Sequence, residues 1–111
     1  MKLTNEFYTM LGFAARARAC VIGTTAVEMA VRKHAVRLLV LDAEVSEASR
    51  AQWEETCRRQ RIPCVVAEPA GEAGRRAGKP AAKVIGVTEK LFAQRMRQLW
   101  EAECNRMEVE D

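Results

Sequence analysis

Few residues in this sequence are suited to catalysis. Nucleophilic catalysis requires a base within reach of an activated serine, threonine or cysteine. The single histidine, His34, falls at the end of a predicted helix in a basic stretch, where we expect it to face solvent. The sequence contains no nucleophile elbow, Walker loop, dinucleotide fingerprint or zinc-protease motif. It therefore predicts a protein that is not an enzyme and that uses no cofactor.

The four cysteines, at positions 20, 57, 64 and 104, form no closely spaced pair. Zinc sites typically use pairs of cysteine or histidine ligands a few residues apart, so the spacing predicts no metal site. Scattered thiols suit a reducing compartment, and we expect them to be free. The alternative is a redox pair of Cys57 and Cys64, which their assignment to different predicted elements disfavours.

Gly23, Thr24 and Thr25 form a segment whose residue types indicate binding. A glycine lets the backbone approach a ligand closely, and the helix predicted to follow presents unpaired N–H groups at its positive end. A phosphate group would fit there. The alternative is an ordinary helix cap made by a threonine side chain.

A second concentration of charge runs over residues 74–83, with cations at positions 75, 76, 79 and 83. Taken alone, it indicates a solvated helix face and turn. Aromatic residues make up only 5% of the chain, so base stacking of the kind seen in single-strand binders is not expected, and recognition of structured RNA by backbone and shape fits better. Other cations flank the predicted strands and favour a basic rim: Arg16, Arg18, Arg32, Lys33 and Arg37.

The charge of the 111-residue chain is unevenly distributed. Residues 1–100 hold 17 Lys and Arg against 10 Asp and Glu, a net charge of +7, whereas residues 101–111 hold one Arg against five acidic residues, a net charge of −4. Fixed positive charge attracts phosphate, so a basic body with an acidic tail is typical of polyanion binders. We expect one domain over residues 1–100 and an acidic helical extension or tail over residues 101–111.

Hydrophobic periodicity predicts helices alternating with short strands. Thr4 or Asn5 should cap the first helix and Ser46 the third, a short fourth helix should cover residues 72–77, and a final amphipathic helix should include Leu91. The strands are predicted at residues 19–22, 38–41, 64–67 and 83–88. The unbroken apolar run at 38–41 indicates a strand buried on both faces at the centre of a sheet. This order predicts an α/β sandwich.

No stretch approaches 18 uninterrupted apolar residues, and the N-terminal residues lack the apolar run of a signal peptide. We therefore expect a cytoplasmic protein that contacts no membrane. A small-molecule substrate is not expected either, because no catalytic or cofactor motif is present.

The ordered motifs resemble the ribosomal kink-turn RNA-binding protein family, and within it the small, bacterial, ribosomal-protein-like branch of YlxQ type. The resemblance runs from about Phe7 to Met96 and opens with residues 11–18 (LGFAARAR). It continues through Gly23, the apolar strand with the Asp-Ala-Glu at 42–44, Cys57, the Arg-Ile-Pro at 61–63, and residues 74–88. It implies a three-layer α/β/α sandwich around a four-stranded mixed sheet.

The family binds structured RNA through the start of its second helix and the loop before its last strand. The resemblance therefore implies an RNA-binding site here, with ribosomal or kink-turn RNA as the partner. The candidate site residues are Gly23, Thr24, Thr25, Ala26, Met29, Arg32, Lys33, Glu44, Lys79, Pro80 and Ala81.

This sequence departs from the family at the second helix. Kink-turn binders begin that helix with Gly-x-Asn-Glu and place a lysine three residues after the glutamate. Thr25, Ala26 and Met29 occupy the three polar positions here. Loss of these side chains removes base-edge contacts, so the alternative function is a protein-interaction adaptor that retains the fold and binds its partner through the C-terminal helix.

Overall fold

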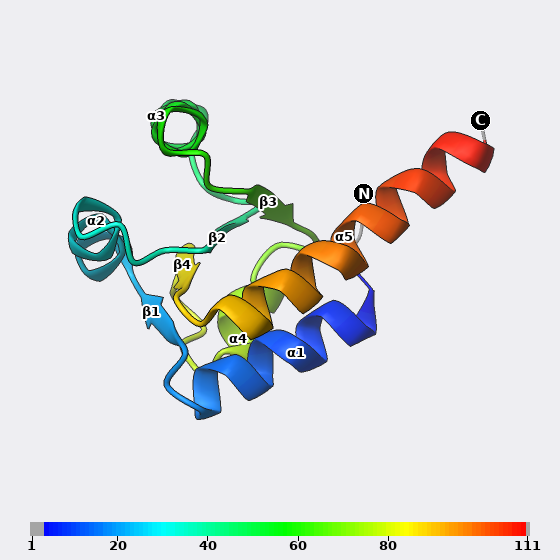
Figure 1. Cartoon of the computed structure of the whole chain (residues 1–111), viewed down its shortest axis with the longest axis horizontal. Coiled ribbons are helices and arrows are strands. Elements are labelled where there is room, and N and C mark those ends of the chain that lie inside the picture. Colours follow the sequence, from blue (N-terminus) through cyan, green and yellow to red (C-terminus); the bar gives the residue numbers. More distant parts are fainter. Residues whose placement is uncertain (1–3, 111) are drawn as a thin grey trace.

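The computed structural model shows helices and strands alternating along the chain (Figure 1). It describes residues 4–110, with side chains for residues 4–105. The described elements are α1 (Asn5–Arg16), β1 (Cys20–Ile22), α2 (Thr24–Arg32), β2 (Leu38–Asp42), α3 (Glu47–Gln60), β3 (Cys64–Ala67), α4 (Glu72–Arg76), β4 (Val84–Val87) and α5 (Lys90–Glu110).

The four strands form one mixed sheet in the order β1-β4-β2-β3. Strands β2 and β3 are parallel, and β4 is antiparallel to both of its neighbours, β1 and β2. Every residue of β2 is buried, as its unbroken apolar run predicts. The predicted four-stranded mixed sheet is confirmed.

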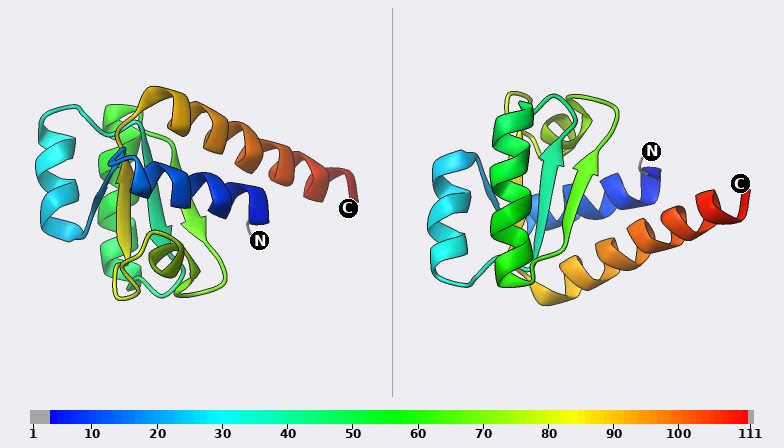
Figure 2. Two further views of the ribbon diagram at one scale, coloured as in Figure 1. Left: turned by 90° about the horizontal axis from the view of Figure 1, so that it is seen from below. Right: turned by 90° about the horizontal axis from the view of Figure 1, so that it is seen from above.

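Helices cover both faces of this sheet (Figures 1 and 2). Helices α2 and α3 cover one face, where Trp53 and Cys57 pack with Leu39 and Leu41 of β2. Helices α1, α4 and α5 cover the other face, and α1 lies along α5. The residues packed there include Phe7, Leu11, Leu38, Val40 and Met96. The three-layer α/β/α sandwich is therefore confirmed.

The helix starts follow local capping chemistry. The Thr4 hydroxyl accepts a hydrogen bond from the Phe7 N–H at 3.2 Å, and the Ser46 hydroxyl accepts one from the Ser49 N–H at 3.2 Å, as predicted. Helix α2 is different, because its cap residue is Gly23 and no side chain bonds its first turn. The alternative interpretation, a cap made by a threonine side chain, is therefore wrong. No hydroxyl accepts a hydrogen bond from the N–H groups in the first turn of α2.

The ends of the last two helices differ slightly from prediction. Helix α4 stops at Arg76, with Ala77 as its cap and Gly78 following at a φ of 83°. Helix α5 continues without a break past residue 100 to Glu110. Most charges assigned to the acidic tail lie outside the described side chains, which end at residue 105, so the division of the chain at residue 100 stays a prediction.

Cys57 and Cys64 lie on different elements, as expected, yet their side chains meet between α3 and β3. A hydrogen bond from the Cys57 thiol to Cys64, together with burial, raises the pKa of Cys57. The same hydrogen bond lowers the pKa of Cys64. Cys20, Cys57, Cys64 and Cys104 are all free.

Candidate nucleic-acid interface

The start of α2 is fixed beside strand β4. The Gly23 N–H donates a hydrogen bond to the carbonyl oxygen of Val84 at 2.9 Å. Gly23 turns the chain from β1 into the helix with a φ of 100°, a conformation that residues with a Cβ rarely adopt. The start of α2 and the segment that enters β4 are therefore neighbours, as the family resemblance implies.

The loop before β4 is folded tightly against α4. The Lys79 N–H donates to the carbonyl oxygen of Gly74 at 2.8 Å, and the Ala82 N–H donates to that of Lys79 at 2.9 Å. A Cβ on Gly74 would lie 2.6 Å from the Lys79 oxygen and 2.9 Å from the Ala82 oxygen. Only a glycine at position 74 lets the loop take this path. The sequence feature that indicates this close contact is an isolated glycine within a predicted helix.

Asp42 holds the other side of the site in place, and the sequence interpretation missed it. The residue is 1% exposed, and its carboxylate accepts hydrogen bonds from the N–H groups of Gly71 at 2.6 Å and Glu44 at 2.9 Å. These bonds tie the turn after β2 to the segment before α4. An acidic residue closing a buried apolar strand was the signal for this role.

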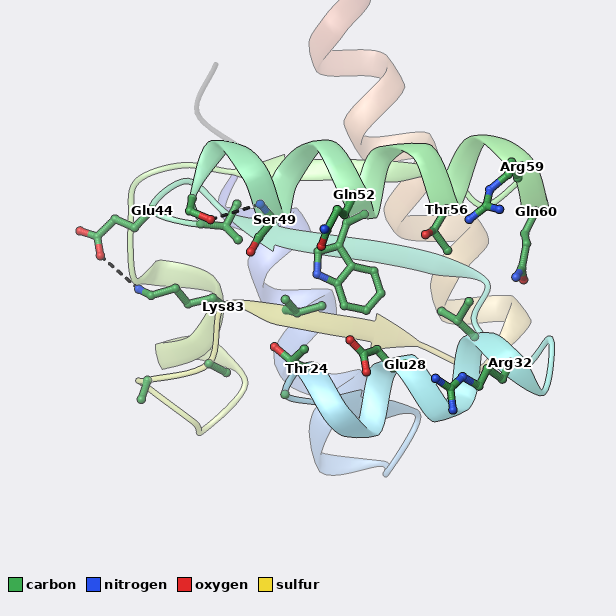
Figure 3. Close-up of a pocket in the computed structure, with 18 residues that line it drawn as sticks. Thr24, Glu28, Arg32, Glu44, Ser49, Gln52, Thr56, Arg59, Gln60 and Lys83 are labelled. Carbon is green, nitrogen blue, oxygen red and sulfur yellow. Dashed lines mark hydrogen bonds and ion pairs between the residues drawn. The ribbon is translucent and has the colours of Figure 1, made fainter.

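These segments border an open groove of about 890 Å³ between α2 and α3 (Figure 3). Its volume lies within the range of ligand sites. Trp53 and Val84 supply apolar surface, and Glu44 and Lys83 form an ion pair of 3.2 Å at one end. Polar side chains from α2 and α3 face each other across the groove: Thr24, Glu28, Arg32, Ser49, Gln52, Thr56, Arg59 and Gln60.

The structure brings together only some of the candidate site residues. Those that line the groove are Gly23, Thr24, Arg32, Glu44 and Ala81. The others lie outside it: Thr25, Ala26, Met29, Lys33, Lys79 and Pro80. The Met29 side chain is 52% exposed, and Lys33 caps the far end of α2 from Gly23.

Acidic partners neutralise much of the positive charge near the start of α2. Arg75 and Arg76 both bond Glu72, at 2.5 and 2.7 Å, and these guanidinium groups lower the pKa of the Glu72 carboxyl. Lys83 pairs with Glu44. Among the described cations of residues 74–83, Lys79 alone carries no ion pair. This end of the sheet is less basic than the sequence predicts.

Three other cations of the predicted rim, Arg18, Lys33 and Arg37, lie at the opposite end of the sheet. β2 begins there, and the Arg37 N–H bonds the carbonyl oxygen of Val87, where β4 ends. Arg18 precedes the strand whose Cys20 pairs with Val87. The predicted single rim is therefore wrong, because antiparallel β4 separates the start of α2 from the loops that hold Arg18, Lys33 and Arg37.

The described residues hold no cluster of three or more His, Cys, Asp or Glu side chains that would bind a metal ion. Within the same part of the chain, none of the helices combines the length and the apolar character needed to cross a membrane. His34 is exposed, as predicted.

Comparison with known proteins places these features in context. No family model matches the chain. The chain is 30% identical over 94 residues to the RNA-binding protein YlxQ of Bacillus subtilis (strain 168), which covers 85% of this chain and 94% of that protein.

Two solved structures share the fold. A protein of unknown function from Bacillus halodurans C superposes with a TM-score of 0.81 at 29% identity, over 86% of this chain and 97% of that one. The Giardia lamblia 15.5kD RNA-binding protein has a TM-score of 0.69 at 12% identity, over 88% and 93% of the two chains. At that identity the second match shows the fold alone.

Proposed function

The chain belongs to the family of the RNA-binding protein YlxQ, and from this premise we propose that it binds structured RNA and catalyses no reaction. The observation that carries the proposal is the juxtaposition of the uncapped start of α2 with the loop before β4. We further propose that the RNA is a kink-turn element of ribosomal RNA and that the protein acts in the cytoplasm.

The start of α2 supplies what a phosphate group needs. No side chain occupies the N–H groups of its first turn, and the positive end of the helix dipole favours an anion. Thr24 and Thr25 are exposed beside these groups, so the backbone is open to a large ligand. Phosphate contacts of this kind position an RNA without reading its sequence.

The loop before β4 adds a cation and apolar atoms on the same side. Lys79 and Pro80 are exposed, and Lys79 has no acidic partner among the described residues. A lysine on a fixed loop attracts phosphate, and Pro80 and Ala81 offer surface against which an unstacked base can lie. The loop and the helix start therefore contact neighbouring parts of one RNA.

Discrimination between RNAs should be modest. Ala26 has no group that accepts a hydrogen bond from a guanine edge, and Met29 has no charge for a phosphate. Each missing base-edge contact lowers discrimination by about 1–3 kcal/mol. Affinity should therefore depend strongly on salt, with a small preference for the kink-turn.

A filter-binding series tests this function. Binding of a kink-turn duplex and of a plain duplex of equal length is measured at about 50 and 200 mM salt, the range over which phosphate contacts are strongly screened. We expect both RNAs to bind at low salt and the kink-turn to bind more tightly. Equal, strongly salt-dependent affinities would leave a general polyanion binder, and no binding at low salt would rule out the RNA-binding function.

One observation favours the alternative adaptor function. Leu91 of α5 is 72% exposed, and α5 projects beyond the rest of the fold (Figure 2). Trp100 packs against the core, so a truncation that tests the extension should begin at residue 101. Light scattering of the full chain and of residues 1–100 checks this. A dimer that is lost on truncation supports an interaction through α5, and a monomer in both cases contradicts self-association.

A further inference from the structure

A second concave surface lies at the end of the sheet where β2 begins. It encloses about 500 Å³ between the turn after α2, the connection from α3 to β3, and the first turns of α5. We call it the basic pocket. Its principal lining residues are His34, Arg37, Arg61, Ile62, Lys90 and Arg97.

The charge of this pocket is of one sign. No acidic side chain in the described part of the chain lines it, in contrast to the groove between α2 and α3, which includes Glu28 and Glu44. Arg97 is paired with Glu101 at 2.8 Å. Arg37, Arg61 and Lys90 are exposed and form no ion pair with any described residue.

Helix stability does not account for this arrangement. A cation after the C-terminal end of a helix is favourable, which explains Arg61 after α3. Lys90, however, is the first residue of α5, where the helix dipole opposes positive charge, and the first turn of α5 contains no acidic residue. Arg37 precedes a strand and gains nothing from a helix. Arg37 and Lys90 thus lie beside Arg61 as unpaired cations that the stability of the helices does not require.

The backbone holds these cations in fixed positions. The Arg37 N–H bonds the Val87 carbonyl oxygen at 2.7 Å. Arg61 adopts a left-handed conformation with a φ of 59° at the end of α3, and its N–H bonds the Arg58 carbonyl oxygen. The guanidinium group of an arginine on a fixed backbone can bind two oxygens of one phosphate at once.

We propose that the basic pocket binds the phosphates of a second RNA segment, an inference that rests on the proposed RNA-binding function. The pocket and the start of α2 lie at opposite ends of β2, whose five residues span roughly 15 Å. One phosphate group cannot touch both surfaces. The protein therefore contacts its RNA at two places on opposite ends of the sheet.

Two triple variants with the same loss of charge test this inference. The first carries Arg37→Gln, Arg61→Gln and Lys90→Gln. The matched control carries Arg50→Gln, Arg58→Gln and Arg95→Gln, which neutralise three exposed arginines that line neither the basic pocket nor the groove and lie outside residues 74–83. Affinity for the kink-turn duplex is measured from about 50 to 200 mM salt. We expect the first variant to bind about tenfold more weakly at low salt, with a salt slope smaller by about 2.7, and the control to change little.

Equal losses in the two variants would overturn the inference, because bulk charge would then explain the binding. Unchanged binding by the first variant, while the wild type binds, would also overturn it and leave the proposed function standing. No binding by the wild type would overturn both. If the first variant melts early, Lys90→Gln alone serves as the test. It should fold, because it removes a charge that the helix dipole opposes, and it should still lower the salt slope by about 0.9.

Discussion

The backbone of Gly74 lies so close to that of Lys79 that a Cβ on Gly74 would stand 2.6 Å from the Lys79 carbonyl oxygen. Helix α4 and the loop before β4 therefore touch through their main chains. The loop that presents Lys79 takes its shape from a residue without a side chain.

Gly74→Ala should destabilise the protein by about 1–3 kcal/mol, because the added methyl group must displace two backbone carbonyl groups. Thermal unfolding should show a melting temperature lower by roughly 4 °C or more. Gly12→Ala is the matched control. Gly12 is also a buried helical glycine, but a Cβ there would meet its neighbours at an ordinary 3.5 Å, so helix propensity should leave that variant as stable as the wild type or more so. Equal melting temperatures for the two variants would contradict this account.

Asp42→Ala should cost about 3 kcal/mol or more in the free energy of unfolding at neutral pH. It leaves the N–H groups of Gly71 and Glu44 without the carboxylate that each bonds, and a hydrogen bond to a charged group contributes about 1.5–3 kcal/mol. Asp42→Asn should lose less, because its one carbonyl oxygen can still serve one of the two N–H groups. Urea unfolding of the wild type and the two variants measures the order of their free energies of unfolding. An Asp42→Ala protein as stable as the wild type would contradict the role of this carboxylate.

Tyr8 should make the protein less stable in alkali. Burial, reinforced by the negative charge of Glu72 and Asp42, raises the pKa of Tyr8 from 10.0 to about 12. The folded state then holds the phenolic proton more tightly than the unfolded state does, so this stability is fully present below pH 10 and is lost as the pH rises from 10 to 12. The phenol also donates to the Glu68 carbonyl oxygen at 2.7 Å, which a phenolate cannot do.

The measurement for Tyr8 is simple, because the chain contains one tyrosine. Tyrosinate absorbance should appear in the folded protein near pH 12 and near pH 10 in denaturant. Tyr8→Phe removes the titrating group and should flatten the dependence of stability on pH over this interval. A folded protein whose tyrosine titrates at pH 10 would contradict the expected shift.

Lys79→Glu and Lys33→Glu should each weaken RNA binding, by about tenfold at low salt, because each places an anion where a cation would face phosphate. Lys79 lies on the loop before β4, whereas Lys33 caps the far end of α2 and precedes His34 of the basic pocket, so the effects of the two changes should be additive. Filter binding of the single and double variants checks this. Arg75→Glu, on α4 beside the loop, is a control for charge reversal at a residue already paired with Glu72.

The combined change Thr25→Asn, Ala26→Glu and Met29→Lys should raise preference for a kink-turn over a plain duplex. It restores the polar groups that the family uses, and its net charge is unchanged, so a gain in preference could not come from bulk electrostatics. Thr25 and Met29 are exposed and can be replaced without repacking the core. A folded triple variant with unchanged preference would show that the recognition surface lies elsewhere.

The features predicted correctly from the sequence depend on short stretches of chain. The unbroken run at 38–41 indicates a buried strand wherever it occurs, and the Thr4 and Ser46 caps act over three residues. These features follow from periodicity and local hydrogen bonding. The α/β order and the sheet class follow from them in turn.

Several of the features that sequence reasoning missed depend on distant partners. Lys83 lies 39 residues from Glu44, and Arg76 lies 71 residues from Asn5, whose side chain it bonds. No local pattern indicates that Glu44 pairs with Lys83 and so neutralises part of the expected rim. The pairing of Glu72 with Arg75 and Arg76 is instead a local pattern, three and four residues apart on one helix, which the sequence interpretation did not use. The division of the cations between two ends of the sheet likewise depends on the direction of β4, which only the tertiary structure fixes.

The strand order has a consequence for how the protein is made. β4 is the strand synthesised last, and it lies between β1 and β2 in the sheet. While the first 83 residues are being translated, β1 and β2 therefore both lack β4 as a neighbour. Until then, β2 and β3 can pair, but β1 has no strand beside it. Pairing of β1 with β4 closes a long loop and is slow for that reason. The nascent chain therefore completes its fold only after β4 has emerged from the ribosome, and a product that terminates before Val84 has no route to the native sheet.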